Sequence, residues 1–368
     1  MAATENTALK EIFDKARFRS VALELAAIYP AFDAKRFLKI AFAGLDGLSL
    51  MQRLRRMTEA LHATLPADYR KTVKILRALA PRIDHGFATL VLPDYVGQHG
   101  LDDFDWSMDA LKYFTGFGSS EFAVREFLRA DLQRALAIMQ TWSRDDSEAV
   151  RRLASEGCRP RLPWSFRLDA ILAEPSLAAP ILENLRADPS LYVRKSVANH
   201  LNDVTKSHPD WVLDRLAAWP LDHPHCAWIA RHALRSLIKA GNTRALAVIG
   251  AGAAPEVKLS KFAVTPRRLA LGERVTLSFE LASKSAASQH LVIDYKMHYV
   301  KKSGATAAKV FKLKELTLAA AQRVSVERSQ SIRDFTTRVH YPGRHEIEIL
   351  VNGLSLARGY FELNCGDE

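Results

Sequence analysis

The hydrophobic period of this sequence changes once, at the small-residue segment 250–255, and this change limits the possible folds more than any other feature. Before it, apolar residues recur every three to four positions, as over residues 22–29, which is the pattern of amphipathic helices. After it, apolar and polar residues alternate, as over 275–281, which is typical of half-buried strands. A chain of 368 residues also exceeds the usual size of one compact core. We therefore predict a multidomain α + β protein with a helical domain over 1–254 and an all-β domain over 255–368.

The alternating segments of the second domain are short and numerous. They lie at 275–281, 290–297, 323–327 and 345–351, and Asn352-Gly353 follows the last of them as a two-residue hairpin signal. About seven short strands in about 110 residues favour an immunoglobulin-like β-sandwich. The Cys, Trp and Cys spacing of antibody domains is missing from this segment.

The helical domain contains an internal echo. Ser147–Arg151 and Ser190–Arg194 share the pattern Ser-x-x-Val-Arg at a distance of 43 residues, and Ala227–Arg231 is a weaker third copy. Such periods are typical of two-helix solenoid repeats of the HEAT or armadillo type, which stack into a long concave surface. The alternative is an ordinary helical bundle in which the echo is coincidental.

The charge balance favours a polyanionic partner such as nucleic acid. Lys and Arg number 52 against 41 Asp and Glu, a formal net charge of +11, and residues 256–368 alone hold 18 against 12. Basic groups of this segment can clamp a duplex, or else can protect strand edges from aggregation. They are Arg267, Arg268, Lys301, Lys302, Lys309, Lys312 and Lys314.

Cellular location is predicted from what the sequence lacks. Its three cysteines are scattered without paired spacing, and it contains neither a run of 18 apolar residues nor a signal-peptide pattern. We expect a cytoplasmic, bacterial-type protein that associates with the nucleoid when bound to DNA, with no membrane contact.

The helix predicted after Ser190 carries one acid among cations. At 100° per residue, its apolar and polar residues separate onto opposite faces. The apolar face comprises Val193, Val197, Leu201 and Val204, and the polar face Lys195, Asn199, Asp203 and Lys206. For Asp203 the simple interpretation is a solvated surface carboxylate. An acid on a surface that faces DNA is repelled by phosphate, however, so its presence there would need a functional reason.

The preceding repeat offers a second acid and a basic loop. Glu156 lies four residues after Arg152, so the two can pair on one helix face, as routine surface ion pairs also do. The loop that follows combines arginines, suited to phosphates, with an indole, suited to a sugar or base face. These loop residues are Arg159, Arg161, Trp164 and Arg167. Trp164 can equally be a core plug between repeats.

A third acid, Glu121, follows the loop and helix-cap signal Gly116–Ser120. This position predicts that Glu121 lies in the first turn of a helix, where an acid is stabilised by the helix dipole. That structural explanation is sufficient for Glu121 by itself.

Two segments carry a family resemblance. Residues 155–164, Ser-Glu-Gly-Cys-Arg-Pro-Arg-Leu-Pro-Trp, and residues 193–203 resemble the HEAT-like alkylpurine DNA glycosylases. The resemblance covers essentially the whole chain and is strongest to the AlkC branch, whose longer members add an immunoglobulin-like domain. The sequence departs from the AlkD branch, which cups the lesion between two tryptophans on a helix with an aspartate in the same turn; here Trp142 precedes Asp145 and Asp146 by only three and four residues.

The resemblance implies a monofunctional DNA glycosylase of base excision repair that works without base flipping. Its substrates would be cationic N-alkylated bases, chiefly 3-methyladenine and also 3-methylcytosine, with 7-methylguanine left open. Carboxylates would stabilise the oxocarbenium-like sugar and position water. By this resemblance Asp203 is the first catalytic candidate, followed by Glu156 and Glu121. The lesion- or DNA-binding candidates are Arg152, Arg159, Arg161, Trp164, Arg167, Lys195, Asn199 and Lys206.

The resemblance further implies double-stranded DNA containing alkylated bases as the partner, a monomer, and no cofactor or metal. Histidines are plentiful over residues 200–232, but no pair has zinc-protease spacing. The alternative function is a non-catalytic helical-repeat adaptor that binds DNA or an acidic protein. Periodicity and charge fit this adaptor equally well.

Overall fold

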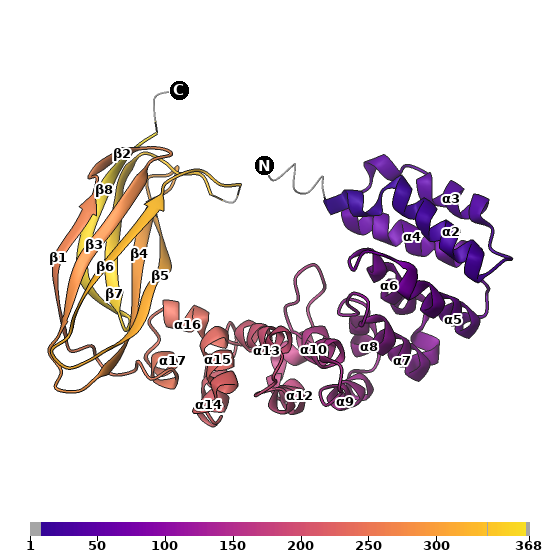
Figure 1. The fold of residues 1–368 in the computed structure, drawn as a ribbon, viewed down its shortest axis with the longest axis horizontal. Helices are drawn as coiled ribbons and strands as arrows, with labels where there is room; N and C mark the ends of the chain where they lie inside the picture. Colours follow the sequence, from indigo (N-terminus) through magenta and orange to yellow (C-terminus); the bar gives the residue numbers. More distant parts are fainter. Residues whose placement is uncertain (1–8, 337, 366–368) are drawn as a thin grey trace. The chain divides into compact units, whose positions relative to one another are not determined.

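Helices and strands occupy separate parts of the chain (Figure 1). The structure, a computed structural model, describes residues 9–336 and 338–365. Its helices end at Val248 and its strands begin at Val257, so the predicted order of a helical region followed by a sandwich is confirmed. No described helix has the length and apolar character needed to cross a membrane.

The helices have the following bounds: η1 Glu11–Phe13, α2 Lys15–Ile28, α3 Ala34–Phe42, η2 Leu45–Gly47, α4 Leu50–Thr64, α5 Tyr69–Leu79, η3 Ala80–Arg82, η4 Ala88–Leu90, α6 Val91–His99, η5 Leu101–Asp103, α7 Phe104–Phe114, α8 Val124–Ala130, α9 Leu132–Trp142, α10 Glu148–Gly157, α11 Asp169–Ala173, η6 Pro175–Ala178, α12 Ala179–Asn184, α13 Leu191–Val204, α14 Pro209–Ala217, α15 Pro224–Ala233, α16 Arg235–Lys239 and α17 Thr243–Val248.

Two compact units divide the chain. The helical unit contains the residues up to Pro209 together with Asp222–Ile229, and the C-terminal unit contains Asp210–Leu221 together with the residues from Ala230 onward. The C-terminal unit thus includes helices as well as strands, because α16 contacts β5 of the sandwich.

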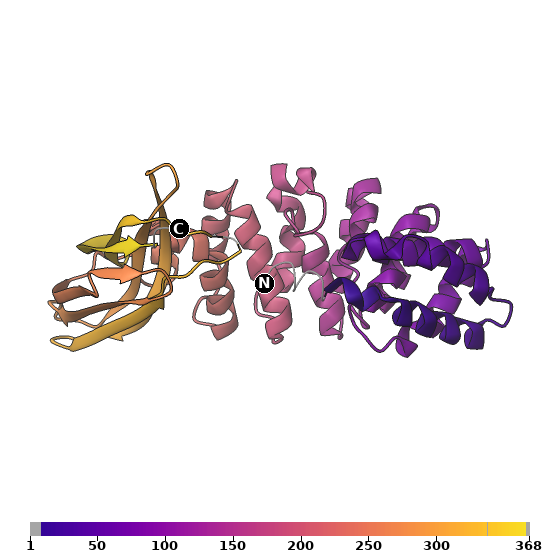
Figure 2. The ribbon, with the colours of Figure 1, turned by 90° about the horizontal axis from the view of Figure 1, so that it is seen from above.

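Paired helices repeat within the helical unit. α10 packs against α13 and α9 against α12, and these helices lie side by side in a row when seen from above (Figure 2). Arg151 and Arg194 explain the echo in the sequence. Each donates hydrogen bonds to two backbone carbonyl oxygens in the loop before its own helix, five and six residues back. In the third copy, Arg231 instead pairs with Glu315.

The sandwich consists of two sheets, with strand orders β1-β3-β6 and β2-β8-β7-β4-β5. Leu277, Ile293, Ile347 and Phe361 belong to the buried core between the sheets. The predicted hairpin at residues 352–353 joins β7 to β8, and both residues have positive φ, as a two-residue turn between twisted strands requires. The strands are β1 Val257–Thr265, β2 Arg268–Ala270, β3 Arg274–Ser283, β4 Gln289–Val300, β5 Thr306–Leu318, β6 Arg323–Ser331, β7 Gly343–Val351 and β8 Leu354–Asn364.

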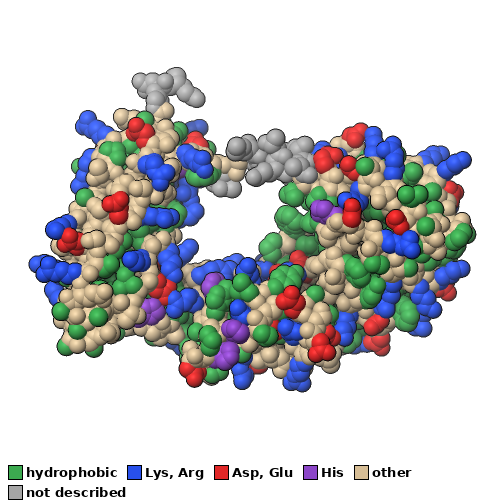
Figure 3. Space-filling view, in the orientation of Figure 1, with side chains coloured by type: hydrophobic (Ala, Val, Ile, Leu, Met, Phe, Trp, Pro, Cys, Tyr) green, Lys and Arg blue, Asp and Glu red, His purple; other side chains and the backbone are tan. Residues whose placement is uncertain are grey.

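Basic side chains gather along the side of the sandwich that carries β5 (Figure 3). Lys309, Lys312 and Lys314 project from this strand and are all exposed. Lys312 also pairs with Glu315 at 2.5 Å. The β5 lysines therefore form a cationic edge. Such an edge is required both for clamping a duplex and for protecting the strand edge from aggregation.

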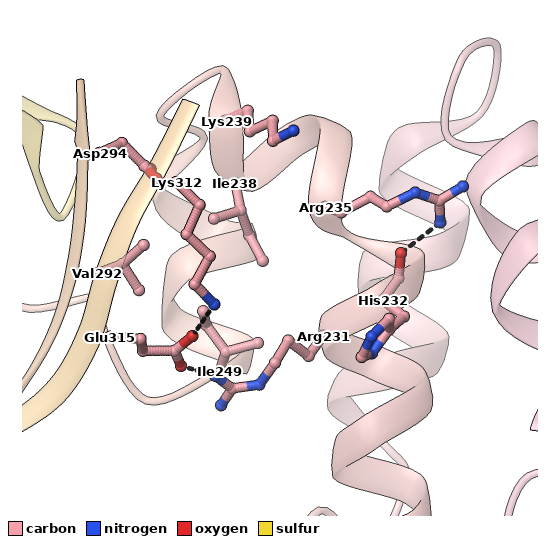
Figure 4. Close-up of a pocket in the computed structure, with 10 residues that line it drawn as sticks. All are labelled: Arg231, His232, Arg235, Ile238, Lys239, Ile249, Val292, Asp294, Lys312 and Glu315. Atoms are coloured by element: carbon pink, nitrogen blue, oxygen red, sulfur yellow. Dashed lines mark hydrogen bonds and ion pairs between the residues drawn. The ribbon is translucent and has the colours of Figure 1, made fainter. Parts of the chain in front are cut away.

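A cavity of about 180 Å³ lies inside the C-terminal unit, between the helices around α16 and strands β4 and β5 (Figure 4). Glu315 lies at the polar part of the cavity lining, where it accepts hydrogen bonds from Lys312 and His290 and pairs with Arg231. Asp294 also lines the cavity and is only 5% exposed. Burial raises the pKa of this carboxyl to about 6, although the charges of Lys312 and Lys239 oppose the rise.

We expect Asp294→Asn to stabilise the protein at neutral pH. Because the folded-state pKa is raised, the native protein binds more protons than the unfolded chain between about pH 4 and pH 6, so the charge of Asp294 costs stability as pH rises through this range. The gain should be about 2 kcal/mol at pH 7.5 and should shrink toward pH 4. Urea unfolding at both pH values measures it.

Asp334→Asn is the control of opposite sign. Hydrogen bonds from the backbone and ring of His340 lower the pKa of Asp334, so its charge stabilises the fold above the unfolded pKa, and the substitution should lose stability at pH 7.5. Equal stability of wild type and Asp294→Asn at pH 7.5 would contradict the explanation given for Asp294.

Candidate active site

Five charged side chains of the helical unit form one chain of ion pairs in which acids and bases alternate. The guanidinium of Arg152 contacts the carboxylates of Glu121 and Glu156, the latter at 3.5 Å. Arg159 Nη1 lies 2.7 Å from Glu156 Oε1, and Arg159 Nη2 lies 2.9 Å from Asp203 Oδ2. The structure therefore brings the three acids selected from the sequence together, joined by two arginines.

The packing of α10 on α13 explains why two of these acids meet. Glu156 lies in the last turn of α10 and Asp203 in the last turn of α13, so both acids lie at the C-terminal ends of two helices that pack together. Arg159 follows α10 directly and its side chain spans the two carboxylates. The predicted pairing of Arg152 with Glu156 is also present.

The sequence predicted Glu121 in the first turn of a helix, and this prediction is wrong, because α8 begins only at Val124. One hydrogen bond of α-helical type, from Val124 N–H to Ser120 O, spans Glu121, but the next two N–H groups bond only three residues back, so this single turn is not continued as an α-helix. Ser119 positions this acid instead. Its hydroxyl donates to Glu121 Oε2 at 2.7 Å and accepts from Arg152 Nη1 at 3.0 Å.

Burial distinguishes this chain of ion pairs from an ordinary surface cluster. Glu156 and Asp203 are each 5% exposed and Arg159 is 8% exposed. The interpretation of Asp203 as a solvated surface carboxylate is therefore wrong, because α10 and Arg159 cover it. Of the polar face predicted for α13, Lys195 and Lys206 are exposed and Asn199 is half-buried. Lys206 Nζ lies 3.5 Å from Asp203 Oδ1.

An open groove of about 510 Å³ runs along this chain of ion pairs. Glu121 and Glu156 line the groove directly, whereas Asp203 is connected to it through Arg159. The complete lining comprises Gly86, Phe87, Leu90, Gly118, Ser119, Glu121, Phe122, Arg152, Glu156, Arg159, Leu162, Pro163, Trp164 and Tyr192. The groove lining thus combines carboxylates with aromatic rings.

Trp164 stands out of the loop between α10 and α11. Its side chain is 67% exposed, so the possibility that it is a core plug between repeats is excluded. Its backbone has φ +63°, a left-handed conformation that is unfavourable for a bulky residue. An exposed indole on a strained backbone contributes little to folding, and the contact of Trp164 with DNA stays a prediction.

The other predicted DNA-binding cations lie around this loop. Arg161 is half-buried, and its Nε has no hydrogen-bond partner among the residues that the structure describes. Arg167 is exposed and pairs with Asp169 at 3.0 Å. Arg159 and Arg152, in contrast, are held by carboxylates inside the site. Contact between Arg159 or Arg152 and DNA stays a prediction.

Comparison with known proteins identifies this arrangement. The model of the family "DNA alkylation repair enzyme" matches residues 101–238, which contain all five charged residues, and a C-terminal Ig-like domain model named after YhaZ matches residues 258–365. The chain is 60% identical to Pseudomonas fluorescens alkylpurine DNA glycosylase AlkC, solved bound to DNA containing an abasic site analog. That likeness has a TM-score of 0.93 and covers 97% of this chain and 99% of the other.

The chain belongs to the AlkC-like DNA alkylation repair enzymes. It is also 41% identical over 346 residues to the uncharacterized protein YhaZ of Bacillus subtilis, covering 94% of this chain and 96% of that protein. These findings confirm the resemblance read from residues 155–164 and 193–203, and they confirm the immunoglobulin-like character of the sandwich.

Sequence reasoning missed two residues of this AlkC-like site. Tyr192 lies 44% exposed at the groove, and the guanidinium of Arg152 stacks over its ring at 4.9 Å. Its place in the first turn of α13, beside the repeat motif, was a usable signal. Arg125 is fully buried and bonds to the backbone of the Trp164 loop. Nothing local in the sequence marks it.

The histidines of the second half of the helical unit hold backbone carbonyls rather than forming a cluster. His200, His208 and His225 each place a ring nitrogen within 3.2 Å of a carbonyl oxygen. Burial lowers the pKa of His200 to about 4, so its ring is neutral at physiological pH. No group of three potential metal ligands occurs among the described residues.

We expect Trp164→Gly to leave the stability of this AlkC-like enzyme within about 1 kcal/mol of wild type, because glycine adopts positive φ freely and little indole surface is buried. Chemical unfolding measures this change. Trp142, which is 4% exposed, supplies the contrast, since Trp142→Ala should cost about 3–5 kcal/mol. A loss above about 2 kcal/mol in Trp164→Gly would show that the indole serves the fold.

Proposed function

We propose that this chain is an alkylpurine DNA glycosylase that hydrolyses the N-glycosidic bond of cationic N-alkylated bases in base excision repair. The observation that carries the proposal is the buried chain of ion pairs that places Glu121, Glu156 and Asp203 beside one open groove. Its whole-length likeness to an AlkC bound to abasic DNA supports the same activity. The proposed bases are 3-methyladenine and 3-methylcytosine.

The proposed hydrolysis of the N-glycosidic bond depends on carboxylates rather than on a general acid that protonates the leaving base. A base alkylated at N3 already carries a positive charge and leaves as a neutral molecule, so the leaving group needs no proton. Positive charge then develops on the deoxyribose, and a fixed carboxylate nearby stabilises it. The same carboxylate can orient or deprotonate the attacking water. Because the groove is open, we propose that the base is not extruded into an enclosed pocket.

Glu156 takes the central role in this proposal. It lines the groove and pairs with both Arg152 and Arg159, so its carboxylate is held from two sides. Glu121 lines the same groove, held by Ser119 and Arg152. Asp203, the first candidate from the sequence, does not line the groove and acts through Arg159, with which it is paired. The two arginines position the acids.

DNA contacts are assigned to the surroundings of the groove. We propose that Trp164 packs on the sugar or base at the lesion, and that Arg161, Arg167, Lys195, Asn199 and Lys206 bind the backbone. Residues 1–254 would carry the chemistry, and residues 255–368 would grip the duplex with the β5 lysines. We further propose a monomer that acts in the cytoplasm, where bacterial DNA is located. The alternative function is a non-catalytic adaptor with the same DNA-binding surface.

Base release from methylated duplex DNA tests the function. The purified protein, without added metal or cofactor, should release free 3-methyladenine, detected by chromatography. Glu156→Gln and Asp203→Asn should each lower the single-turnover rate by about 100-fold or more, with the larger loss for Glu156→Gln. Affinity for DNA should stay equal or become tighter, because each change removes a charge that phosphate repels.

Asp188→Asn is the matched control for these variants. Asp188 is 6% exposed and pairs with Arg151 at 2.7 Å, so it is an equally buried, arginine-bound acid outside the groove. It should lose stability without a specific loss of rate. If wild type binds DNA but releases no base, the result would contradict the glycosylase and support the non-catalytic adaptor. A rate that falls only as affinity falls would make Asp203 and Glu156 binding residues.

The salt dependence of DNA binding tests the proposed grip of the sandwich. Lys309→Gln combined with Lys314→Gln should make the slope of log K against log salt shallower by up to about 1.8, since each lost phosphate contact changes it by about 0.9. Lys258→Gln combined with Lys284→Gln removes the same charge from exposed positions outside β5. Equal slopes in the two double variants would show that β5 makes no phosphate contact.

A further inference from the structure

A fully buried arginine lies beneath the loop that carries Arg159 and Trp164. Arg125, in α8, is 0% exposed, and its guanidinium donates hydrogen bonds to the backbone carbonyl oxygens of Gly157 at 3.0 Å, Arg159 at 2.7 Å and Phe166. Burying an arginine is costly unless its donors are satisfied. Here the partners of Nη1 and Nη2 are backbone carbonyl oxygens, and in the described structure Nε has no hydrogen-bond partner and no carboxylate is bonded to the guanidinium.

The three carbonyls bracket the loop. Gly157 and Arg159 lie at its beginning and Phe166 near its end, so one guanidinium fastens both ends of the segment. The ring of Phe166 closes over the same group, 5.3 Å from the Arg125 guanidinium carbon. The loop between these points presents Trp164 to the groove.

Close packing of α8 on the end of α10 makes this reach possible. A Cβ atom at Gly157 would lie 2.5 Å from Val124 Cγ1, so a side chain there would push the two helices apart. The absence of a side chain at residue 157 lets α8 approach until Arg125 contacts the carbonyls. The distance from Arg125 to the loop is therefore set in part by the contact of the Val124 side chain with the bare backbone of Gly157.

The Arg125 guanidinium also supplies a fixed positive charge beside the acids. Burial lowers the pKa of Arg125 to about 10, and the charges of Asp203 and Glu156 act against this lowering. Arg125 is thus protonated at neutral pH.

We propose that Arg125 is a positioning residue of the site, which fixes the backbone of Arg159 so that its side chain bridges Glu156 and Asp203 while the loop holds Trp164 at the groove. This assignment rests on the proposed function. Arg125 touches neither groove nor substrate and acts through the loop. The contribution of Arg125 to the rate is therefore expected to exceed its contribution to DNA affinity.

Arg53 distinguishes positioning from simple structural support. It is 3% exposed and also donates to three backbone carbonyl oxygens, those of Leu48, Lys10 and Phe13, and in addition it pairs with the Glu11 carboxylate at 3.3 Å. It lies in α4 and reaches no part of the Trp164 loop. Arg53 variants therefore report what the loss of a buried, carbonyl-bonded arginine does to folding alone.

The test compares Arg125→Gln and Arg125→Lys with Arg53→Gln and Arg53→Lys in the full chain. Four quantities are measured: the single-turnover rate of 3-methyladenine release, the Kd for duplex DNA with an abasic site, the urea midpoint, and the rate of tryptic cleavage after Arg161 and Arg167. We expect Arg125→Gln to lower the rate about 100-fold with Kd within about threefold, because small misplacements of catalytic groups have effects of this size.

The lysine and proteolysis measurements complete the comparison. Arg125→Lys should recover part of the rate, since an ammonium has three donors, and Arg125→Gln should be cleaved faster in the loop than either Arg53 variant. A wild-type rate in Arg125→Gln, or equal rate losses in Arg125→Gln and Arg53→Gln at equal midpoints, would overturn the proposal. Should wild type release no base, the proposed function fails, while loop cleavage still decides whether Arg125 fastens the loop.

Discussion

The interaction on which the site depends is the bridge that Arg159 makes between Glu156 and Asp203. Two carboxylates that are each 5% exposed could not share this space without a cation between them, because their mutual repulsion would add to the cost of leaving water. The bridge requires the ends of α10 and α13 to be adjacent, which the repeat provides. It also requires the segment after α10 to turn back over α13, which the loop provides.

In the mechanism that we propose, this arrangement reconciles two conflicting demands. Negative charge is needed where the sugar becomes cationic, yet the surrounding phosphates repel negative charge. The site meets both demands by burying the acids and interleaving them with arginines, so that the groups Glu121, Arg152, Glu156, Arg159 and Asp203 together carry a formal charge of −1. The net positive charge of the chain can then attract the duplex as a whole.

Much of the architecture was predictable because it follows from local patterns. The change of period at residues 250–255, the 43-residue echo and the hairpin at 352–353 each depend on neighbours along the chain, and each is confirmed. The environment of Asp203 was not predictable in this way. A helix considered alone places Asp203 on a polar face, and only the packing of α10 and Arg159 from 44 residues away buries it.

Arg125 and Trp164 show two further limits of sequence reasoning. The partners of Arg125 are backbone carbonyls 32 to 41 residues away. Every residue has a backbone carbonyl, so residue type does not indicate which carbonyls Arg125 contacts. Trp164 has a left-handed backbone at a non-glycine position, which no composition rule anticipates. The three acids could be selected by chemistry, but their common groove became visible only in the folded chain.

The arginines that recur in the helical repeats have a consequence for how this chain can vary. Arg151 and Arg194 hold the loops before their helices through main-chain oxygens, and these bonds do not depend on the side chains of the loop residues. The side chains of Asp145 and Asp188 are engaged separately, with Lys112 and Arg151. Asp146 and Pro189 are therefore the loop positions at which a substitution can change the side chain while the arginine bonds are preserved.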